Sequence, residues 1–201
     1  MLWGGAIQSF INDGHFGIGL EGSDYSKKMQ RSAWPIISRF LHTCDITKPF
    51  EIVDEEKNQR IKFDVVTAWE VMEHIAPDYI DILALNVKNH LAKDGLWIMS
   101  VSHDEEIING VRLHQSVFPK DWWVDKFEKL GFKHYENLVR YFNSQFVRGA
   151  KYGAPNSSHL VLTIKNDTPP HAPQQSMVRK LFDWWVGSRP QQVLKRIILG
   201  T

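Results

Sequence analysis

The feature that most constrains the fold is a strand–helix–strand pattern in the middle of the chain. Residues 63–69, F-D-V-V-T-A-W, are apolar and rich in β-branched side chains, which is typical of a buried strand. Residues 77–91 then carry apolar side chains at helical spacing, with Gly95 beyond their end, and residues 96–101 are again apolar. Two neighbouring strands joined through a helix run parallel in a sheet. The pattern therefore predicts an α/β fold.

The flanking segments extend this pattern. Further strands are expected at residues 18–21, 40–46, 133–141 and 159–164, and the polar, charged residues 48–60 are expected to form an exposed connection. Helices are expected at residues 3–12, at 26–40 with a break at Pro35, and at 119–130, where Pro119 begins the helix and Gly131 ends it. Strands that alternate with helices predict a Rossmann-like, mostly parallel sheet with helices on both faces.

The chain divides into a body, a linker and a tail. We expect one domain over residues 1–166, followed by a linker at 167–175, D-T-P-P-H-A-P-Q-Q, which has three prolines. Residues 176–201 place apolar side chains at helical spacing, which predicts an amphipathic helical tail. The tail has a net charge of +4, with Asp183 as its one acidic residue.

Composition excludes several classes of protein. The net charge of +1 over 201 residues gives no general attraction to phosphate backbones, so we expect no nucleic-acid partner. Cys44 is the single cysteine, which excludes a disulfide framework and a cysteine-built zinc site within the chain and favours a reducing, cytoplasmic setting. No apolar run approaches the length of a membrane span.

Acidic residues follow three of the expected strands. Glu21 ends the first strand, Asp45 ends the second, and Glu70 and Glu73 follow the third. Ligands of α/β sheets bind where the carboxyl ends of the strands point, so these residues matter more than their neighbours. A glutamate for ribose hydroxyls and an aspartate for an adenine amino group would together form an adenosine pocket.

Four segments resemble a known family. G-I-G-L-E-G-S-D, C-D-I-T, F-D-V-V-T-A-W-E-V-M-E-H-I and L-A-K-D-G-L-W-I-M-S-V occur in the order and at the spacing of class I S-adenosylmethionine-dependent methyltransferases. The resemblance covers roughly residues 3–164, and E-V-M-E-H-I is similar to the E-V-L-E-H-I signature of a branch that acts mostly on small molecules. It implies S-adenosylmethionine as cofactor and a small-molecule or sugar-like acceptor.

The resemblance also implies roles for individual residues. Glu21 would hold the ribose hydroxyls, Asp45 and Ile46 would contact the adenine, and Trp69 and Glu70 would lie along the methionine end of the cofactor. In such an enzyme, proximity and orientation supply most of the catalysis, with a base if the acceptor is a hydroxyl. The implied sites are cofactor-binding Gly4, Glu21, Gly22, Asp45, Ile46, Trp69 and Glu70, and catalytic His74, His103 and Asp104.

The chain departs from the family at its beginning. A family member starts with a strand that runs into a glycine-rich loop, whereas this chain begins M-L-W-G-G-A, so that only Gly4 matches the loop and the first strand is missing. The free energy lost with a central strand should exceed the roughly 5–15 kcal/mol by which domains are stable. We expect that the chain is a truncated version of a longer protein; the alternative is a naturally shortened, non-catalytic relative.

Each candidate residue also has a purely structural interpretation. Glu21 and Asp45 could be turn or helix-capping acids, and His74 could merely shape the turn that follows its strand. His103 and Asp104 belong to a polar stretch that is typical of a solvated loop. No spacing typical of metal ligands occurs there, and we therefore assign no metal.

The sequence thus predicts methyl transfer from S-adenosylmethionine to a small-molecule or glycan-type acceptor. The two cations Arg148 and Lys151, in the long segment 143–158, favour an anionic or sugar-like acceptor. The alternative is a non-catalytic binding or assembly module on the same fold. In either case, the basic amphipathic tail predicts contact with a membrane surface or a partner protein, although such a stripe can also dock onto its own domain.

Overall fold

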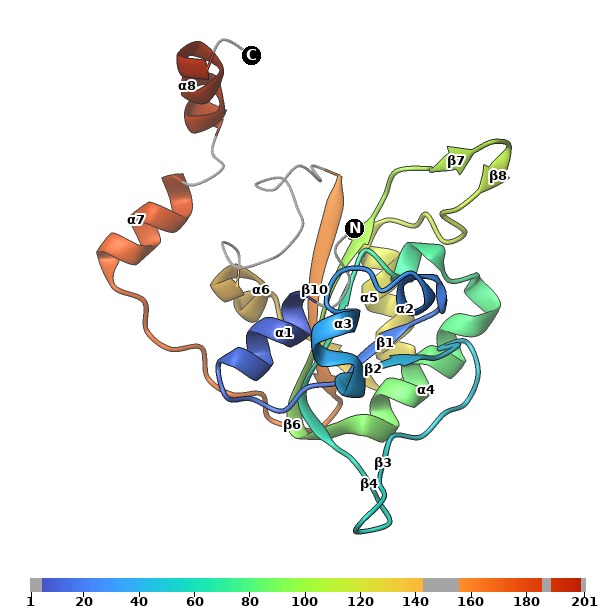
Figure 1. Cartoon of the computed structure of the whole chain (residues 1–201). Helices are drawn as coiled ribbons and strands as arrows, with labels where there is room; N and C mark the ends of the chain where they lie inside the picture. The colour runs from blue at the N-terminus through green and yellow to red at the C-terminus, as the bar shows by residue number, and fades with distance from the viewer. Residues whose placement is uncertain (1–4, 143–155, 186–188, 200–201) are drawn as a thin grey trace. The chain divides into compact units, whose positions relative to one another are not determined.

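The computed structural model describes residues 5–142, 156–185 and 189–199 (Figure 1). It contains two compact units, one within residues 1–49 and the other within residues 50–201. Each unit has its own strands and its own buried apolar residues. The two units are therefore described one after the other.

The first unit is built around a pair of parallel strands. Leu20 of one strand pairs with His42 of the other, and Glu21 pairs with Thr43. A small core of Ala33, Trp34, Ile37 and Leu41 packs beside them. Its elements are α1 (Gly5–Asn12), β1 (Gly19–Glu21), α2 (Tyr25–Lys28), α3 (Trp34–Ile37), η1 (Ser38–Phe40) and β2 (Leu41–Thr43).

The helix expected at 26–40 is instead two short helices and a 3-10 turn. Gln30 and Ser32 have φ angles of 48° and 54°, which end helical geometry between α2 and α3. Pro35 does not break a helix, because it lies in the first turn of α3, where a missing N–H costs nothing. The prediction of one helix broken at Pro35 was therefore wrong, because the chain turns before the proline.

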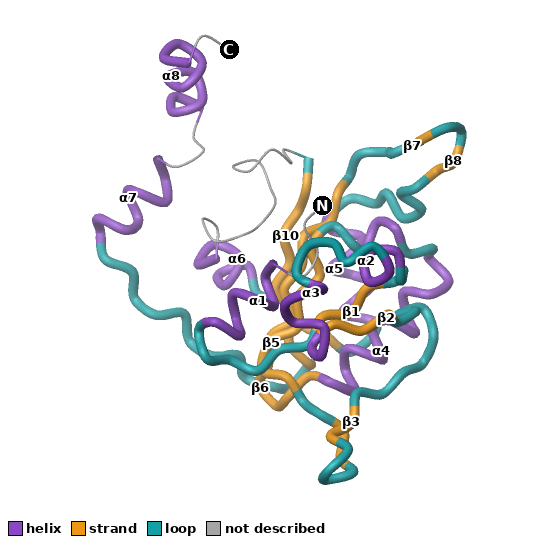
Figure 2. The backbone as a smooth tube through the Cα atoms, viewed as in Figure 1, coloured by secondary structure: helices purple, strands orange, loops and turns teal. Residues whose placement is uncertain are grey.

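The second unit contains a four-stranded sheet in the order β5-β6-β10-β9, of which β5, β6 and β10 are labelled in Figure 2. β5 and β6 are parallel, and β10 is antiparallel to both β6 and β9. Its elements up to the end of the sheet are β3 (Val53–Asp54), β4 (Gln59–Arg60), β5 (Phe63–Trp69), η2 (Met72–His74), η3 (Pro77–Tyr79), α4 (Ile80–His90), β6 (Leu91–Ser102), β7 (Ile107–Ile108), β8 (Val111–Arg112), α5 (Lys120–Lys129), β9 (Phe132–His134), α6 (Glu136–Phe142) and β10 (Ser157–Ile164).

The predicted α/β class and the central strand–helix–strand pattern are confirmed by β5, α4 and β6. Gly95 lies beyond the end of α4, as expected, and inside β6. A side chain there would come within 3.0 Å of the carbonyl oxygens of Asp64 and Ala92, so a glycine allows this close backbone approach. β6 begins at Leu91, so it also includes residues 92–95, which precede the strand expected at 96–101.

Helices cover both faces of the sheet (Figure 1). On one face, Leu96 and Ile98 of β6 and Val161 of β10 pack against Leu138 of α6. Side chains alternate along a strand, so Trp97 points to the other face, where its ring lies 4.8 Å from that of Phe127 of α5. These two layers form the core of the unit.

Two predicted segments of the second unit are corrected by the structure. The strand expected at 133–141 ends at His134, and α6 follows, because Leu138 and Phe142 pack on the sheet at helical spacing. The connection expected at 48–60 contains the β3–β4 hairpin, whose turn includes Asn58 at a φ of 50°. Both errors concern short segments for which apolar periodicity is ambiguous.

The strands form separate sheets rather than one continuous sheet. β1 pairs with β2, whereas β5 is the outermost strand of the four-stranded sheet. Within the described residues, no strand pairs with the other side of β5. Val65 of β5 is 47% exposed, although its strand has the composition of one buried on both faces.

Two helices follow the proline-rich segment: α7 (Met177–Trp185) and α8 (Arg189–Leu199). Apolar side chains recur along each helix and are exposed, among them Val178 and Phe182 of α7 and Val193 and Ile197 of α8. No described helix combines the length and the apolar character that crossing a lipid bilayer requires.

Candidate functional site

In the first unit, the Glu21 carboxylate lies at the carboxyl end of β1 and is held by two hydrogen bonds. The Ser26 hydroxyl donates to Oε1 and the Trp34 indole N–H donates to Oε2, each at 2.7 Å. Glu21 thus organises the turn between β1 and α3. Each oxygen retains a second lone pair, so the carboxylate can also accept hydroxyl donors from a ligand.

Asp45 and Ile46 follow β2. Asp45 Oδ1 accepts hydrogen bonds from the Thr47 N–H at 3.1 Å and the Thr47 hydroxyl at 2.5 Å, and Oδ2 lies 3.1 Å from Lys48 Nζ. The Thr47 hydroxyl, followed by the Lys48 ammonium, holds the pKa of the Asp45 carboxyl below its ordinary value. Asp45 therefore closes a local turn, and its side chain is exposed beside the half-buried Ile46.

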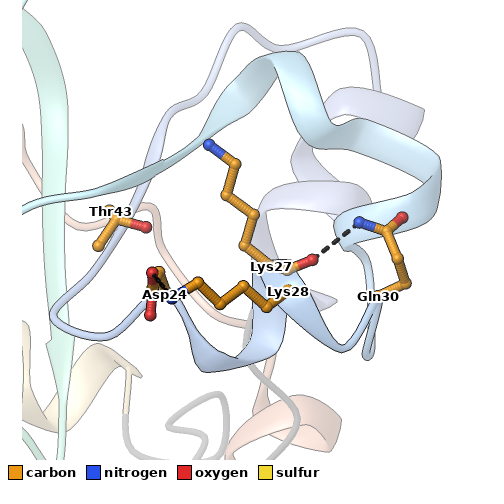
Figure 3. Close-up of a pocket in the computed structure, with 5 residues that line it drawn as sticks. All are labelled: Asp24, Lys27, Lys28, Gln30 and Thr43. Atoms are coloured by element: carbon orange, nitrogen blue, oxygen red, sulfur yellow. Dashed lines mark hydrogen bonds and ion pairs between the residues drawn. The ribbon is translucent and has the colours of Figure 1, made fainter.

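An open hollow of about 660 Å³ lies at the end of β2 (Figure 3). Lys28 Nζ is paired with Asp24 at 2.6 Å, and Gln30 Nε2 donates to the Lys27 carbonyl at 2.8 Å. Lys27 Nζ lies 5.7 Å from the centre of a Trp34 ring. The lining residues are Asp24, Lys27, Lys28, Gln30 and Thr43.

In the second unit, Trp69 and Glu70 form the carboxyl end of β5. The Glu70 backbone has a φ of 52°, and its N–H lies 3.1 Å from both the carbonyl and the hydroxyl oxygen of Ser100. The Ser157 hydroxyl donates to Glu70 Oε2 at 3.0 Å. Trp69 packs against the apolar layer around Leu96. The chain therefore turns sharply at Glu70, and the side chain of Glu70 is held toward β10.

His103 and Asp104 lie directly after β6. His103 Nδ1 is 2.7 Å from the Phe118 carbonyl oxygen, and its Nε2 is 2.6 Å from the Ser158 hydroxyl. Nδ1 must donate to the carbonyl, so Nε2 of a neutral ring accepts from Ser158. The Asn156 amide donates to Asp104 Oδ1 at 2.7 Å. Both polar atoms of the His103 ring are thus already engaged.

His74 lies instead beside Glu73 and His114, a group that the sequence did not predict. The rings of His74 and His114 are 4.7 Å apart, and ligand atoms of all three side chains lie within 4.8 Å of one another. About 40 positions separate Glu73 and His114 in the sequence, so their contact was not predicted. The contact depends on how the segment 103–116 folds back, which no local spacing reveals.

Glu73 is an unusual carboxylate. It is 0% exposed, and no described group forms a hydrogen bond with either of its carboxylate oxygens. Burial, reinforced by repulsion from the Glu70 carboxylate, raises the pKa of the Glu73 carboxyl to about 8. Buried polar atoms without partners are rare in folded proteins, and they occur preferentially at functional positions.

The predicted site residues therefore fall into separate groups. Glu21, Gly22, Asp45 and Ile46 belong to the first unit, where Gly22 is exposed and follows Glu21 directly. The second unit holds Trp69, Glu70, His74, His103 and Asp104. Gly4, Arg148 and Lys151 lie outside the described residues.

Comparison with known proteins gives matches in structure alone. No protein-family model matches the sequence, and no curated protein matches it. An S-adenosylmethionine-dependent methyltransferase from Clostridium acetobutylicum matches 82% of this chain over 81% of its own length, with a TM-score of 0.56 and 9% identity. A glycopeptide N-methyltransferase, solved with S-adenosylhomocysteine, matches 80% of this chain over 78% of its own, with a TM-score of 0.52 and 13% identity.

A third structure adds a neighbour with a bound acceptor. The 1,6-didemethyltoxoflavin-N1-methyltransferase of Burkholderia thailandensis, solved with 1,6-didemethyltoxoflavin and S-adenosylhomocysteine, matches 82% of this chain. The chain covers 67% of that protein, with a TM-score of 0.54 and 16% identity. At such identities the likeness concerns the fold alone. The chain therefore has the fold of the class I S-adenosylmethionine-dependent methyltransferases.

Proposed function

We propose that this chain transfers a methyl group from S-adenosylmethionine to a small-molecule or glycan-type acceptor. The observation that carries the proposal is Glu21, an acid at the carboxyl end of a parallel strand in a fold whose neighbours are methyltransferases solved with S-adenosylhomocysteine. The carboxyl ends of parallel strands are where ligands bind in α/β sheets. A cytoplasmic location is part of the proposal, supported by the single cysteine.

Several residues fit a nucleoside cofactor. Glu21 retains acceptor capacity for two ribose hydroxyls, and Gly22 has open space within 4 Å of where a side chain would begin. Asp45 and Ile46 would contact the adenine. Gly4, Trp69 and Glu70 would hold the methionine part.

The bound cofactor would supply an electrophilic methyl group on a sulfonium ion. The protein would then align the acceptor and, for a hydroxyl acceptor, remove a proton. Of the three proposed catalytic residues, His74 is best suited as the base. Its Nδ1–H donates to the Leu113 carbonyl at 3.2 Å, which leaves Nε2 as the acceptor nitrogen. His103 and Asp104, which are held by neighbours, would position the acceptor.

The acceptor class is inferred from the cationic residues of this chain and from the substrates named for its structural neighbours. The structural neighbours act on a glycopeptide and on 1,6-didemethyltoxoflavin, as their names state. We infer an acceptor that is anionic or sugar-like, as the cations Arg148 and Lys151 favour. A screen of acids and nucleotide sugars against neutral analogues tests this inference, and equal turnover of neutral compounds would contradict it.

The cofactor proposal is tested by calorimetry with S-adenosylmethionine and S-adenosylhomocysteine on the full chain. We expect Glu21→Gln to weaken binding about tenfold, because it removes the negative charge that strengthens two ligand hydrogen bonds. Glu128→Gln, an exposed acid on α5, is the matched control and should bind as the wild type does. Absence of binding by the wild type would refute the proposal, and binding without methyl transfer would favour a non-catalytic module.

The tail supports a second function, peripheral contact with an anionic membrane. The apolar residues Met177, Val178, Leu181 and Phe182 of α7 are each more than half exposed. They lie on one side of a helix, and the tail carries a net charge of +4. The full chain should pellet with vesicles that contain anionic lipid but not with purely zwitterionic vesicles. Equal behaviour with both would leave a partner protein as the alternative.

A further inference from the structure

We propose that Glu73, His74 and His114 form a binding site for a divalent transition-metal ion such as Zn²⁺. Their ligand atoms lie within 4.8 Å of one another, and they come from η2 and from the segment after the β7–β8 hairpin. The sequence analysis assigned no metal, because no local ligand spacing is present. This inference is independent of cofactor binding and of methyl transfer.

Both histidines are oriented as metal-binding histidines usually are. His74 Nδ1 donates to the Leu113 carbonyl at 3.2 Å, and His114 Nδ1 donates to the Asp104 carbonyl at 2.5 Å. A hydrogen bond from one ring nitrogen to a backbone carbonyl fixes the tautomer and leaves the other nitrogen as a ligand. The Nε2 atoms of both rings therefore carry the lone pairs.

The Glu73 carboxylate provides the independent observation. It is 0% exposed, and neither oxygen has a hydrogen-bond partner among the described residues. Burying such a group without a partner is costly, and in proteins buried carboxylates are normally paired or bound to metal. A cation held by Glu73 and the two imidazoles would remove this cost.

Glu106 places a second carboxylate next to His114. Its Oε2 lies 3.2 Å from His114 Nε2. A metal ion bound to His114 Nε2 would therefore have the Glu106 carboxylate beside it. Glu106 is partly exposed and is therefore available as a fourth, more mobile ligand.

The backbone holds the two halves of the site together. The N–H groups of Gln115 and Ser116 donate to the Glu73 carbonyl at 2.7 and 3.0 Å, and the Ser116 hydroxyl donates to the Ile75 carbonyl at 2.6 Å. Ligands of one ion bonded at about 2.1 Å lie within about 4.2 Å of each other. In a tetrahedral site they lie about 3.4 Å apart. Side-chain movements of about 1 Å would therefore bring the three groups, now within 4.8 Å of one another, to coordination distance.

The types of ligand atom at the site determine which metal ions it favours. Two imidazole nitrogens with carboxylate oxygens favour Zn²⁺, Fe²⁺ or Co²⁺ over Mg²⁺ and Ca²⁺, which prefer oxygen alone. A bound ion would occupy the same His74 Nε2 that is available as a base. The two roles of His74 exclude each other in one state, and the metal measurement is made without cofactor so that the two can be judged separately.

The test uses the full chain after removal of metals with a chelator. Co²⁺ is added while visible absorption is recorded, and Zn²⁺ binding is measured by calorimetry. We expect one ion per chain, a tetrahedral Co²⁺ spectrum, and at least about 100-fold weaker binding by Glu73→Gln. His42→Gln replaces an exposed histidine outside the cluster and should bind as the wild type does.

The variant Glu73→Gln replaces a buried carboxyl group that has no hydrogen-bond partner among the described residues by an amide of the same shape, so it should fold, with an unfolding temperature no lower than that of the metal-free wild type. Glu106→Gln, at a partly exposed position, serves as a second variant and should weaken Zn²⁺ binding several-fold. Absence of stoichiometric binding by the wild type would overturn the proposal, as would wild-type affinity in Glu73→Gln.

Discussion

Replacing Glu21 separates its structural role from its proposed ligand role. In Glu21→Ala, the indole N–H of Trp34, a residue that is 2% exposed, loses its acceptor. Leaving a buried donor unpaired costs about 1–3 kcal/mol, and loss of the half-exposed Ser26 bond adds about 0.5–1.5 kcal/mol. We therefore expect Glu21→Ala to lower the free energy of unfolding by about 1.5–4.5 kcal/mol.

Glu21→Gln should behave differently. The amide oxygen of glutamine can still accept the Trp34 N–H, and its NH₂ group can donate to the Ser26 hydroxyl oxygen. Only the charge assistance of the two bonds is lost, which we expect to cost about 1 kcal/mol or less. A weaker affinity of Glu21→Gln for S-adenosylhomocysteine would therefore report on the ligand contact rather than on a disrupted turn.

Urea denaturation followed by far-UV circular dichroism and tryptophan fluorescence measures both variants. Glu55→Ala, at an exposed acid of the second unit, is the control and should change the free energy of unfolding by less than about 0.5 kcal/mol. Equal destabilisation by Glu21→Ala and Glu21→Gln would refute the reasoning, because the hydrogen bonds would then matter less than the charge. No effect of either would show that the turn does not depend on Glu21.

Three further predictions follow. Gly131→Ala should lower the free energy of unfolding by about 1 kcal/mol, because Gly131 has a φ of 87° after α5; an unchanged denaturation midpoint would contradict this. Burial and the nearby Asp45 carboxylate raise the pKa of the Cys44 thiol. Iodoacetamide at pH 8.5 should therefore alkylate Cys44 more slowly than free cysteine, and equal rates would contradict this prediction. Leu160→Ala, in a fully buried position, should cost about 2–5 kcal/mol in the same denaturation assay, and a loss below 1 kcal/mol would mean that the core repacks.

The sequence predicted the central part of the fold well, for a physical reason. Residues 63–69 are rich in β-branched and aromatic side chains, which favour a strand, and β5 has these bounds. The segment after His134 was assigned wrongly, because a short apolar run fits a strand or a helix face equally. Packing of Leu138 on the sheet decides for the helix, and this contact is not visible in the local sequence.

At the candidate site, too, local sequence patterns were predictive and tertiary contacts were not. Glu21 was identified from its place at a strand end, because that place follows from local pattern and from the general topology of α/β sheets. The neighbourhood of Glu73 and His114 was not predicted, since it depends on backbone hydrogen bonds between η2 and residues 115–116. Tertiary contacts between loops carry no periodic signal in sequence.

The outer position of β5 has a consequence for handling the protein. Residues 65–68, V-V-T-A, carry no charge, and in the described part of the chain their strand has a sheet neighbour only on the β6 side. An uncharged, partly exposed edge of this kind is a template on which another extended chain can add backbone hydrogen bonds. The chain should therefore self-associate at high concentration, and a charged substitution at the exposed Val65 would improve its solubility.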